Sequence, residues 1–368
     1  MRQRIYLDNS ATTQLDSRVF KAMIQELERP TGNPSSLHGF GREAKKRLTS
    51  ERDCIAHFLK IKSSELIFTS GGTEALNLLI HGLYSGGEIL SSDVEHAAVY
   101  KTLLNFSDVT LLPARLHGAI TPEQLEAAIT ERTRLIVLTA VNSETGVKSD
   151  VEALAAIAEM HKIPLIIDAV AWLGKERFVI PRGVTGMAFS AHKIHGPKGA
   201  GAAFIRSGAQ LSPCITGGEQ EKGRRAGTEN ITGIVGFAEA IRQLDLLLPE
   251  ATERMEQLMQ LFIQGVLAKT EAVINGEGPK ICSTINLSFP GHLGEDLLIQ
   301  LDLLGVATSH GSACSSGALE PSRVLLNMGY EAIRTKSALR FSISRETTEQ
   351  EILEAVAIIS DLVSPSSL

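Results

Sequence analysis

Short apolar runs that end in polar residues recur along the middle of the chain. Two of them, at residues 164–168 and 186–193, end in Asp168 and Lys193. Runs of this length predict strands that are buried on both faces. Open α/β sheets place their ligand sites at the carboxyl ends of such strands, so these two ends predict a site.

The same pattern alternates with helical periodicity over much of the chain. Strands are predicted at residues 65–69, 134–139 and 201–205, and helices at residues 75–80 and 150–161. Alternating strands and helices are typical of βαβ units, in which the strands run parallel. We therefore expect an α/β fold with a mainly parallel sheet.

The pattern changes in the last third of the chain. Residues 250–268 are amphipathic with acidic residues near their start, which predicts a connecting helix. Beyond them, strands are predicted at residues 285–289 and 338–343, with a helix that begins at about residue 294. We place a domain boundary near residue 250.

Composition narrows the class of protein. The chain has 368 residues, 43% of them hydrophobic and 21% charged, with a net charge of −6, which is the profile of a soluble globular protein. The acidic balance argues against direct binding of nucleic acid or an anionic membrane, and no apolar run approaches the roughly 20 residues of a membrane span. Because no signal-peptide pattern opens the chain and its cysteines are widely separated, we expect a cytoplasmic protein without a zinc site or a disulfide framework.

A lysine and an aspartate at neighbouring strand ends have a specific chemical use. A lysine amine can form a Schiff base with the aldehyde of pyridoxal 5'-phosphate (PLP), and an aspartate can keep the pyridine nitrogen protonated, so that the ring acts as an electron sink. Lys193 and Asp168 suit these two roles. The alternative is that two core strands end in ordinary solvated charges, as many strands do.

Residues 70–73 form a glycine-rich turn between a predicted strand and a predicted helix. Glycines let the backbone approach a ligand closely, and the free N–H groups at a helix N-terminus favour a phosphate. Such turns are common, so this one is weak evidence by itself. Ser190 and His192 precede Lys193 and strengthen the case, because they could complete a phosphate cup.

Three further residues have side chains suited to catalysis or binding. His96 lies at a strand-to-helix junction, where a histidine is most often a cap or a core residue but could also stack on a pyridine ring and move protons. Cys314 lies in a stretch of small polar residues, 308–317, which predicts an exposed, mobile loop where nearby cations could stabilise a thiolate. Arg340 could bind a carboxylate through two hydrogen bonds, or it could form an ordinary surface ion pair.

Taken together, these residues resemble those of the cysteine desulfurases, fold-type I PLP enzymes grouped with the class-V aminotransferases. The resemblance extends over nearly the whole chain. The longer Cys-bearing loop is similar to that of the branch that serves general iron–sulfur cluster assembly and tRNA thiolation. The matching segments are residues 6–13, 32–38, 69–74, 95–96, 141–146, 190–199, 225–228, 311–314, 319–322 and 340–342.

The resemblance implies a fold and an assembly. It implies an α/β, PLP-dependent transferase fold of type I, with a large domain built on a mainly parallel seven-stranded sheet and a smaller α+β domain. It also implies a homodimer, in which Thr228 of one subunit reaches the phosphate bound by the other. The expected large domain is residues 13–250, and the expected small domain, with the catalytic Cys loop, is residues 1–12 and 251–368.

The resemblance also implies a reaction. Lys193 would carry the Schiff base, and Cys314 would attack the sulfur of PLP-bound L-cysteine, which leaves a persulfide on Cys314 and releases L-alanine. The persulfide would pass to a sulfur acceptor or an iron–sulfur scaffold protein, and Cys314 could transiently bind a cluster. No resident metal ion is expected.

Other roles follow from the resemblance, residue by residue. Lys198 lies past the motif position and is expected to be structural. Asp168 would pair with the pyridinium, while His96 would stack on the ring and act in catalysis. Asn33 and Arg340 would bind the substrate carboxylate. The expected phosphate ligands are Gly72, Thr73, Ser190, His192 and Thr228.

Two positions depart from the family pattern. Ser143 stands where the family usually has Asn, and Ala171 stands where it usually has Gln. Both family side chains donate a hydrogen bond to the phenolic oxygen of PLP; Ser143 can still donate one and Ala171 cannot. Such a bond contributes roughly 1.5–3 kcal/mol, so we expect a more basic phenolate and an effect of about tenfold or more on the rate or the Schiff-base pKa. Trp172 follows directly and could reshape the pocket.

Other functions stay open at this point. The same scaffold could act on selenocysteine or cysteine sulfinate, reactions that depend less on a loop cysteine. A true aminotransferase is less favoured because it has no role for Cys314. The chain could also be a PLP-fold protein with little turnover that acts as a binding or assembly component, which the changes at Ser143 and Ala171 would favour.

Overall fold

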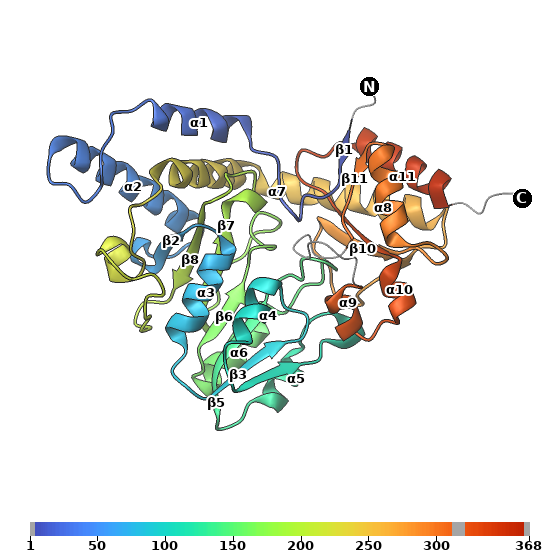
Figure 1. The fold of residues 1–368 in the computed structure, drawn as a ribbon, viewed down its shortest axis with the longest axis horizontal. Coiled ribbons are helices and arrows are strands. Elements are labelled where there is room, and N and C mark those ends of the chain that lie inside the picture. The colour runs from blue at the N-terminus through green and yellow to red at the C-terminus, as the bar shows by residue number, and fades with distance from the viewer. Residues whose placement is uncertain (1–3, 311–320, 364–368) are drawn as a thin grey trace, which may run out of the picture.

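A seven-stranded sheet forms the centre of the larger of two lobes (Figure 1). The computed structural model describes residues 4–310 and 321–363. The strand order is β2-β8-β7-β6-β5-β3-β4, and within this sheet only β8 runs against its neighbours, which confirms the expected mainly parallel sheet. The strands are β2 (Leu66–Thr69), β3 (Glu88–Ser92), β4 (Val109–Leu112), β5 (Thr133–Thr139), β6 (Leu165–Asp168), β7 (Val184–Ser190) and β8 (Gly201–Ile205).

Both faces of this sheet are buried. Leu165 and Ile167 of β6 pack in one hydrophobic cluster, and Ile166 between them packs in another. These strands are continuously apolar because neither face meets water. Helices α3 (Gly72–Leu83) and α4 (Ala97–Leu103) cover one face, and α2 (Gly39–Phe58), α6 (Val151–His161) and the first part of α7 (Ile231–Leu267) cover the other. The remaining helices of this lobe are α1 (Ser17–Leu27), α5 (Pro122–Ala128) and the short 3-10 helices η1 (Ser63–Glu65), η2 (Arg115–His117), η3 (Ala191–Lys193) and η4 (Gln220–Gly223).

The small lobe combines the two ends of the chain (Figure 1). Its main sheet is antiparallel in the order β12-β10-β9, and β1 pairs in parallel with β11 beside it. Ile5 and Leu7 share a hydrophobic cluster with side chains from residues 255–359, so the N-terminal segment belongs to the core of this lobe. The elements are β1 (Ile5–Tyr6), β9 (Val273–Ile274), β10 (Thr284–Ser288), α8 (Gly294–Leu303), β11 (Val306–Ala307), α9 (Arg323–Asn327), α10 (Ala332–Lys336), β12 (Ala338–Ser342) and α11 (Glu349–Val363).

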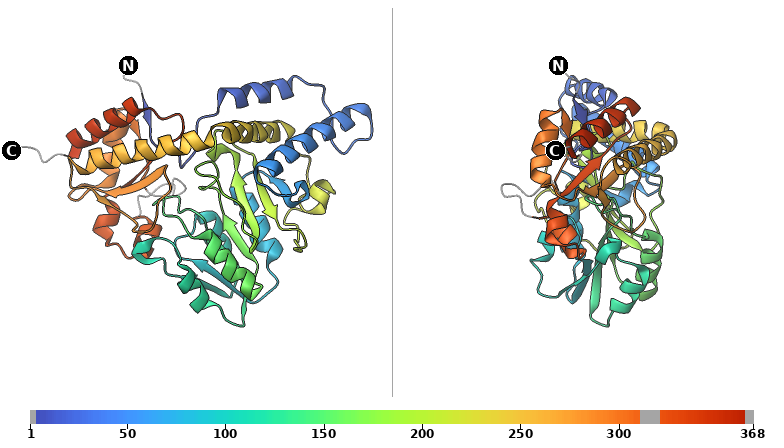
Figure 2. Two further views of the ribbon diagram at one scale, coloured as in Figure 1. Left: turned by 180° about the vertical axis from the view of Figure 1, so that it is seen from behind. Right: turned by 90° about the vertical axis from the view of Figure 1, so that its right-hand side faces the viewer.

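Helix α7 runs through both lobes (Figure 2). Leu248 belongs to the core of the large lobe and Phe262 to that of the small lobe. The sequence pattern placed a helix start at residue 250, which is wrong, because the helix begins at Ile231. Acidic residues marked the predicted start because they are typical of a first helical turn, but Glu250 and Glu253 lie inside the helix, just after Pro249. Among the described residues, no helix combines enough length and apolar character to cross a membrane.

Candidate active site

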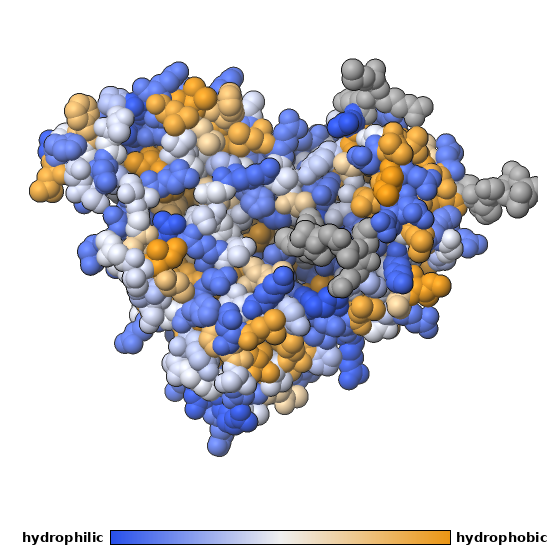
Figure 3. All heavy atoms as spheres, in the orientation of Figure 1, coloured by the Kyte–Doolittle hydropathy of each residue, from blue (hydrophilic) through white to orange (hydrophobic). Residues whose placement is uncertain are grey.

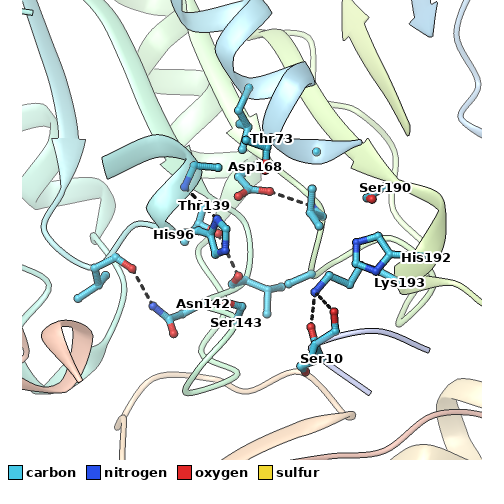
Figure 4. A pocket seen from close by; sticks show the side chains of 18 of the residues that line it. Ser10, Thr73, His96, Thr139, Asn142, Ser143, Asp168, Ser190, His192 and Lys193 are labelled. Carbon is cyan, nitrogen blue, oxygen red and sulfur yellow. Dashed lines mark hydrogen bonds between the residues drawn. The ribbon is translucent and has the colours of Figure 1, made fainter. Parts of the chain in front are cut away.

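The carboxyl ends of β6 and β7 open onto a cavity of about 200 Å³ (Figure 4). Most of its wall belongs to the large lobe, while the N-terminal segment and the small lobe close the remaining side. The cavity brings together most of the residues to which the sequence analysis gave a role. Its polar lining residues are Ser10, Thr73, His96, Thr139, Asn142, Ser143, Asp168, Ser190, His192, Lys193 and Arg340, and Gly72 and Ala171 also line it.

Lys193 and Asp168 reach the cavity from adjacent strands. β6 ends at Asp168 and pairs in parallel with β7, which continues directly into η3 with Lys193 at its end. The Lys193 Nζ donates hydrogen bonds to the carbonyl oxygens of Ser10 and Ala11, the latter at 3.0 Å. The N-terminal segment therefore holds this amine at the cavity wall.

The electrostatics of Asp168 favour a positively charged ligand. Burial raises the pKa of its carboxyl group, whereas His96, the Val170 N–H at 2.9 Å and Lys193 act in the opposite direction. A buried carboxylate needs positive charge or hydrogen bonds to remain ionised. A cationic group bound in the cavity would therefore be stabilised by Asp168 and would stabilise it in turn.

A cradle for an anion lies at the N-terminus of α3. The Ser190 Oγ is buried and has no hydrogen-bond partner among the described residues, so it is available to a ligand. A Cβ on Gly72 would lie 2.5 Å from Val170 Cγ2, so this first helical position has no room for a side chain. The free N–H groups of the first turn favour negative charge. These features fit the phosphate of PLP.

His192 enters this cradle as a neutral side chain. Burial, together with the charges of Lys193 and Lys198, lowers the pKa of His192 to about 4. Its Nδ1 lies 3.2 Å from Thr12 Oγ1. At neutral pH it can contribute a hydrogen bond but no charge. Lys198 itself is exposed and does not line the cavity.

His96 both caps a helix and faces the cavity. Its Nδ1 accepts a hydrogen bond from the Ala98 N–H at 3.1 Å at the start of α4. Because Nδ1 is an acceptor, the neutral ring carries its proton on Nε2. The imidazole lies beside Asp168 on the cavity wall (Figure 4), so the capping and pocket interpretations of this residue are compatible.

Arg340 is buried, so the alternative of an ordinary surface ion pair is wrong. It is 2% exposed on β12, with Nη2 at 2.6 Å from Asp8 Oδ1, and its Nη1 donates to the Ser143 carbonyl at 3.1 Å. Its Nε has no hydrogen-bond partner among the described residues. A carboxylate bound in the cavity would therefore share this guanidinium with Asp8.

The two departures from the family pattern both line the cavity, but the neighbouring tryptophan does not. Ser143 and Ala171 lie on the wall. The Trp172 ring stacks on Phe178, with the ring centres 4.1 Å apart, and its Nε1 donates to Glu176 Oε1 at 2.7 Å. These contacts hold the indole outside the cavity, so Trp172 does not reshape it directly.

Two residues with expected roles, Asn33 and Thr228, are not part of the cavity in this structure. Asn33 and Thr228 are exposed, and Asn33 Oδ1 accepts a hydrogen bond from the Ser35 N–H at 2.9 Å. Cys314 lies outside the described residues. Their roles stay predictions.

The sequence suggested no role for Asn142 or Asp8, because it shows the motif that contains each residue but not the contacts that the residue makes. Asn142 Oδ1 accepts hydrogen bonds from the N–H groups of Glu144 and Thr145, each at 3.0 Å, and so shapes the turn that carries Ser143. Asp8 holds Arg340. Both lie in the matching segments, but neither stands out there by residue type.

Comparison with known proteins identifies the family. The aminotransferase class-V model matches residues 5–354. The cysteine desulfurase IscS of Dictyoglomus turgidum is 37% identical, over 99% of this chain and 95% of its own length. The chain belongs to the cysteine desulfurases of the class-V aminotransferase family. A solved NifS-like protein has a TM-score of 0.91 at 32% identity and covers 98% of this chain and 99% of its own, and SspA in complex with cysteine has a TM-score of 0.83 at 28% identity, with 94% and 100% covered.

The family and the fold agree with the cavity. Class-V aminotransferases depend on PLP, which confirms the expected cofactor, and the structural neighbours confirm the type I transferase fold. The unpartnered Ser190 hydroxyl, the glycine at the start of α3 and the buried Asp168 all fit this cofactor.

Proposed function

We propose that this cysteine desulfurase converts L-cysteine to L-alanine and retains the sulfur as a persulfide on Cys314. The observation that carries this proposal is that Lys193, Asp168 and Arg340 line one cavity although they come from η3, β6 and β12. An amine for an aldehyde cofactor, a carboxylate for its ring and a guanidinium for a carboxylate suit an amino-acid substrate. The named relatives favour desulfuration over the selenocysteine, cysteine sulfinate and low-turnover alternatives.

The large lobe would hold the cofactor. Lys193 would bind it covalently through Nζ, Asp168 would pair with the ring nitrogen and His96 would stack on the ring. When bound, PLP supplies an electron sink for the bond-breaking step. Ser143 would donate a hydrogen bond to the phenolic oxygen. The phosphate ligands within this chain would be Gly72, Thr73, Ser190 and His192.

The small lobe would hold the substrate. Arg340 would bind the carboxylate of L-cysteine, with its Nε as a donor that has no partner among the described residues. Asn33 would have to move toward the cavity to add a second contact, because it is exposed in this structure. His96, with its proton on Nε2, would hold or donate that proton inside the cavity.

Cys314 would accept the sulfur. The chain that precedes it is attached to the cavity wall, where Ser309 and Arg340 exchange two backbone hydrogen bonds at 2.7 and 3.3 Å. Cys314 is five residues beyond Ser309, and five extended residues span at most about 18 Å. The chain is thus long enough for its thiol to reach a substrate held by Arg340.

A homodimer would complete the site. Exposed apolar side chains occur on α1, at the start of α2 and in the chain just before α2 (Figure 3); they include Phe20, Leu27, Phe40 and Leu37, and Leu37 is 90% exposed. Such surfaces are typical of protein–protein contacts. Thr228 is exposed and does not line the cavity of its own chain, which suits a contact with the phosphate in the partner subunit.

The sulfur would pass to a protein acceptor in the cytoplasm, for iron–sulfur cluster assembly or tRNA thiolation. The similarity of the Cys-bearing loop to that branch of the family supports this destination. Cys54, Cys214 and Cys282 are free thiols, and free thiols persist in a reducing compartment. On this scheme Cys314 could also bind a cluster transiently during transfer.

Intact-protein mass spectrometry tests the function. The PLP-loaded protein is mixed with L-cysteine, and alanine is quantified in the same tube. We expect one added sulfur that maps to Cys314 and a matching amount of alanine, with the adduct lost in Cys314→Ala and kept in Cys54→Ala. Bound PLP with neither product would refute the proposal, and faster turnover of selenocysteine or cysteine sulfinate would reassign the substrate.

A further inference from the structure

A buried lysine contacts the turn that carries Lys193 from outside the cavity. Lys175 follows β6 in the chain and is 7% exposed. Its Nζ donates a hydrogen bond to the backbone carbonyl of Lys193 at 3.4 Å, and its side chain does not line the cavity. Burial of an amine is costly, and the reaction proposed above gives Lys175 no role.

The backbone of Lys175 fixes the position of this amine. The Lys175 carbonyl oxygen accepts hydrogen bonds from Thr252 Oγ1 at 2.8 Å and from Cys282 Sγ at 3.5 Å. Thr252 belongs to α7, and Cys282 packs against the core of the small lobe. Contacts with α7 and with the small lobe therefore hold the amine at the Lys193 carbonyl.

The charge of Lys175 has no counterion in the part of the chain that the structure describes. No described carboxylate forms an ion pair with its Nζ. Burial lowers the pKa of Lys175 to about 8, so the amine is protonated at neutral pH and mostly neutral at pH 9. A charge in a poorly solvated place interacts with other charges more strongly than a charge in water does.

The other ionisable groups around Lys175 are neutral or paired. Burial raises the pKa of the Cys282 thiol to about 11 and lowers the pKa of His195 to about 3, so neither side chain is charged at neutral pH. The Arg345 guanidinium forms an ion pair with Asp16 at 2.7 Å. None of these groups cancels the charge of Lys175.

Two carboxylates on adjoining segments do not cancel it either. Glu176, the next residue in the chain, forms an ion pair with Lys148 at 3.0 Å. Glu256 on α7 is exposed, so water and salt screen its charge. The Lys175 ammonium is therefore an uncompensated positive charge on this side of Lys193.

The amine of Lys193 lies close enough to interact with this charge. A lysine amine is at most roughly 8 Å from the carbonyl oxygen of its own residue, so the two amines lie within about 12 Å of each other. Like charges at that distance in a protein interior change each other's proton affinity by about one pKa unit. On the cavity side Asp168 acts in the opposite direction, while His192 is neutral and Lys198 is exposed.

We propose that Lys175 is a positioning residue that acts on Lys193 through its charge: the buried ammonium repels a proton from the Lys193 amine and so favours the neutral form that attacks the cofactor aldehyde. In that step the amine lone pair forms a bond to the aldehyde carbon, and the aldehyde oxygen leaves as water with the two amine protons. A second cationic group nearby is one of the ways in which proteins activate a lysine. The inference rests on the role of Lys193 proposed above.

Lys280 provides a matched control. Its Nζ also donates to a backbone carbonyl, that of Gly276, and burial also lowers its pKa. Gly276 belongs to the chain between β9 and β10 and not to the turn that carries Lys193, and Lys280 does not line the cavity. Removal of the Lys280 charge should therefore leave the Lys193 amine unchanged.

The test follows the return of PLP to the full-length protein after the cofactor has been removed. At saturating PLP, the rise of the visible absorption band gives the rate of covalent attachment. At pH 7 this rate should be about five- to tenfold lower in Lys175→Met than in the wild type, because more of the Lys193 amine is protonated. At pH 9 the difference should disappear, because Lys175 is mostly neutral there in the wild type.

Lys175→Arg and Lys280→Met complete the comparison. Lys175→Arg keeps the charge and should attach PLP at the wild-type rate at pH 7, and Lys280→Met should match the wild type at both pH values. If Lys175→Met does not fold, Lys175→Gln replaces it, because glutamine is also neutral. If Lys175→Arg does not fold, the pH dependence of the neutral variant decides.

Three outcomes would overturn the inference: the wild-type rate in Lys175→Met at pH 7, an equal slowing in Lys280→Met, or a slowing in Lys175→Met that is the same at pH 7 and pH 9. The last would mean that Lys175 acts through its hydrogen bond and not through its charge. Failure of the wild-type protein to attach PLP at Lys193, located by borohydride reduction and mass spectrometry, would instead refute the proposed role of Lys193 itself.

Discussion

The two sides of the cavity are built in different ways. On the large-lobe side, Asp168 and Lys193 are placed by the parallel register of β6 and β7, and they lie close together in the sequence. On the small-lobe side, Arg340 is held by an ion pair with Asp8, a residue 332 positions away in the chain. The first side is a consequence of the sheet, whereas the second depends on contacts between residues far apart in the chain.

This difference indicates what a substitution on each side should change. The strands beneath Asp168 and Lys193 are buried on both faces, so loss of one polar group there should remove a chemical function and leave its neighbours in place. Arg340 depends on Asp8 and the Ser143 carbonyl for its position. We therefore expect chemical effects on the sheet side and effects on substrate affinity on the small-lobe side.

The largest effect should come from Lys193 on the sheet side. Lys193→Ala removes the amine that would bind the cofactor covalently, so turnover of L-cysteine should fall on the order of 10³-fold or more. Lys198→Ala is the matched control, because this lysine is exposed and does not line the cavity. Mass spectrometry after borohydride reduction should find cofactor attached to Lys198→Ala and not to Lys193→Ala. The reverse result would mean that the assignment is wrong.

The next largest effect should come from Arg340. A lysine cannot reproduce the fork of a guanidinium, and hydrogen bonds to charged groups contribute roughly 1.5–3 kcal/mol. In Arg340→Lys, the KM for L-cysteine should rise by about 10- to 100-fold while kcat changes less.

Arg345→Lys is the control for this prediction. Its guanidinium also forms a buried ion pair, with Asp16 at 2.7 Å, but it does not line the cavity. Its KM should stay unchanged even if its stability falls. Equal increases of KM in the two variants would show that Arg340 acts through the fold and not through the substrate.

The same contrast explains what the sequence could and could not predict. The strands that end near Asp168 and Lys193 were predictable because burial on both faces leaves a continuous apolar run, and polar residues stand out where that run ends. The pairing of Asp8 with Arg340 was not predictable, because no local pattern marks a contact between residues so far apart. The start of α7 was placed too late because acidic residues, here Glu250 and Glu253, occur inside helices as well as in their first turn.

The residues singled out by resemblance also fall into two groups, those that line the cavity and those that do not. Ser143 and Ala171 were noticed only because they differ from the family pattern, and both prove to line the cavity. Asn33 and Thr228 were assigned by motif, yet both are exposed here. A motif gives the type of residue at a position, but its environment depends on contacts with distant segments or with a second subunit.

A smaller effect, again on the sheet side, should follow from Ala171→Gln. Glutamine would add a donor to the wall, and a hydrogen bond to the phenolic oxygen would stabilise its deprotonated form. The midpoint of the pH titration of the visible absorption band should therefore fall by about one pKa unit in the loaded protein. Ala171→Leu adds volume without a donor and should leave the midpoint unchanged. An unchanged midpoint in Ala171→Gln would mean that residue 171 does not set the basicity of the phenolic oxygen.

The smallest effect on turnover should come from Glu95, which lies where the two sides meet. Its carbonyl accepts from Arg323, and its side chain accepts hydrogen bonds from Ser92 Oγ at 2.9 Å and the Thr139 N–H at 3.0 Å. Burial nevertheless raises the pKa of Glu95 from 4.5 to about 8, with a further contribution from the charge of Asp168. The carboxyl group is therefore mostly protonated at neutral pH, so Glu95→Gln replaces one neutral group by another and kcat should change little.

The stability of Glu95→Gln, in contrast, should depend on pH in a characteristic way. The unfolded chain releases the Glu95 proton near pH 4.5, whereas the folded protein keeps it up to about pH 8. The wild-type protein therefore loses stability from this group as the pH rises between these values, and Glu95→Gln should not. Urea unfolding near pH 5 and near pH 8 should show a gain for the variant only at the higher pH. Glu88→Gln should show no such change between these two pH values, because hydrogen bonds from three threonines outweigh burial and lower the pKa of Glu88 below 4.5, so its contribution to stability is lost only in more acidic solution. A large loss of kcat in Glu95→Gln would instead mean that the ionised carboxylate is needed at the point where the two sides of the cavity meet.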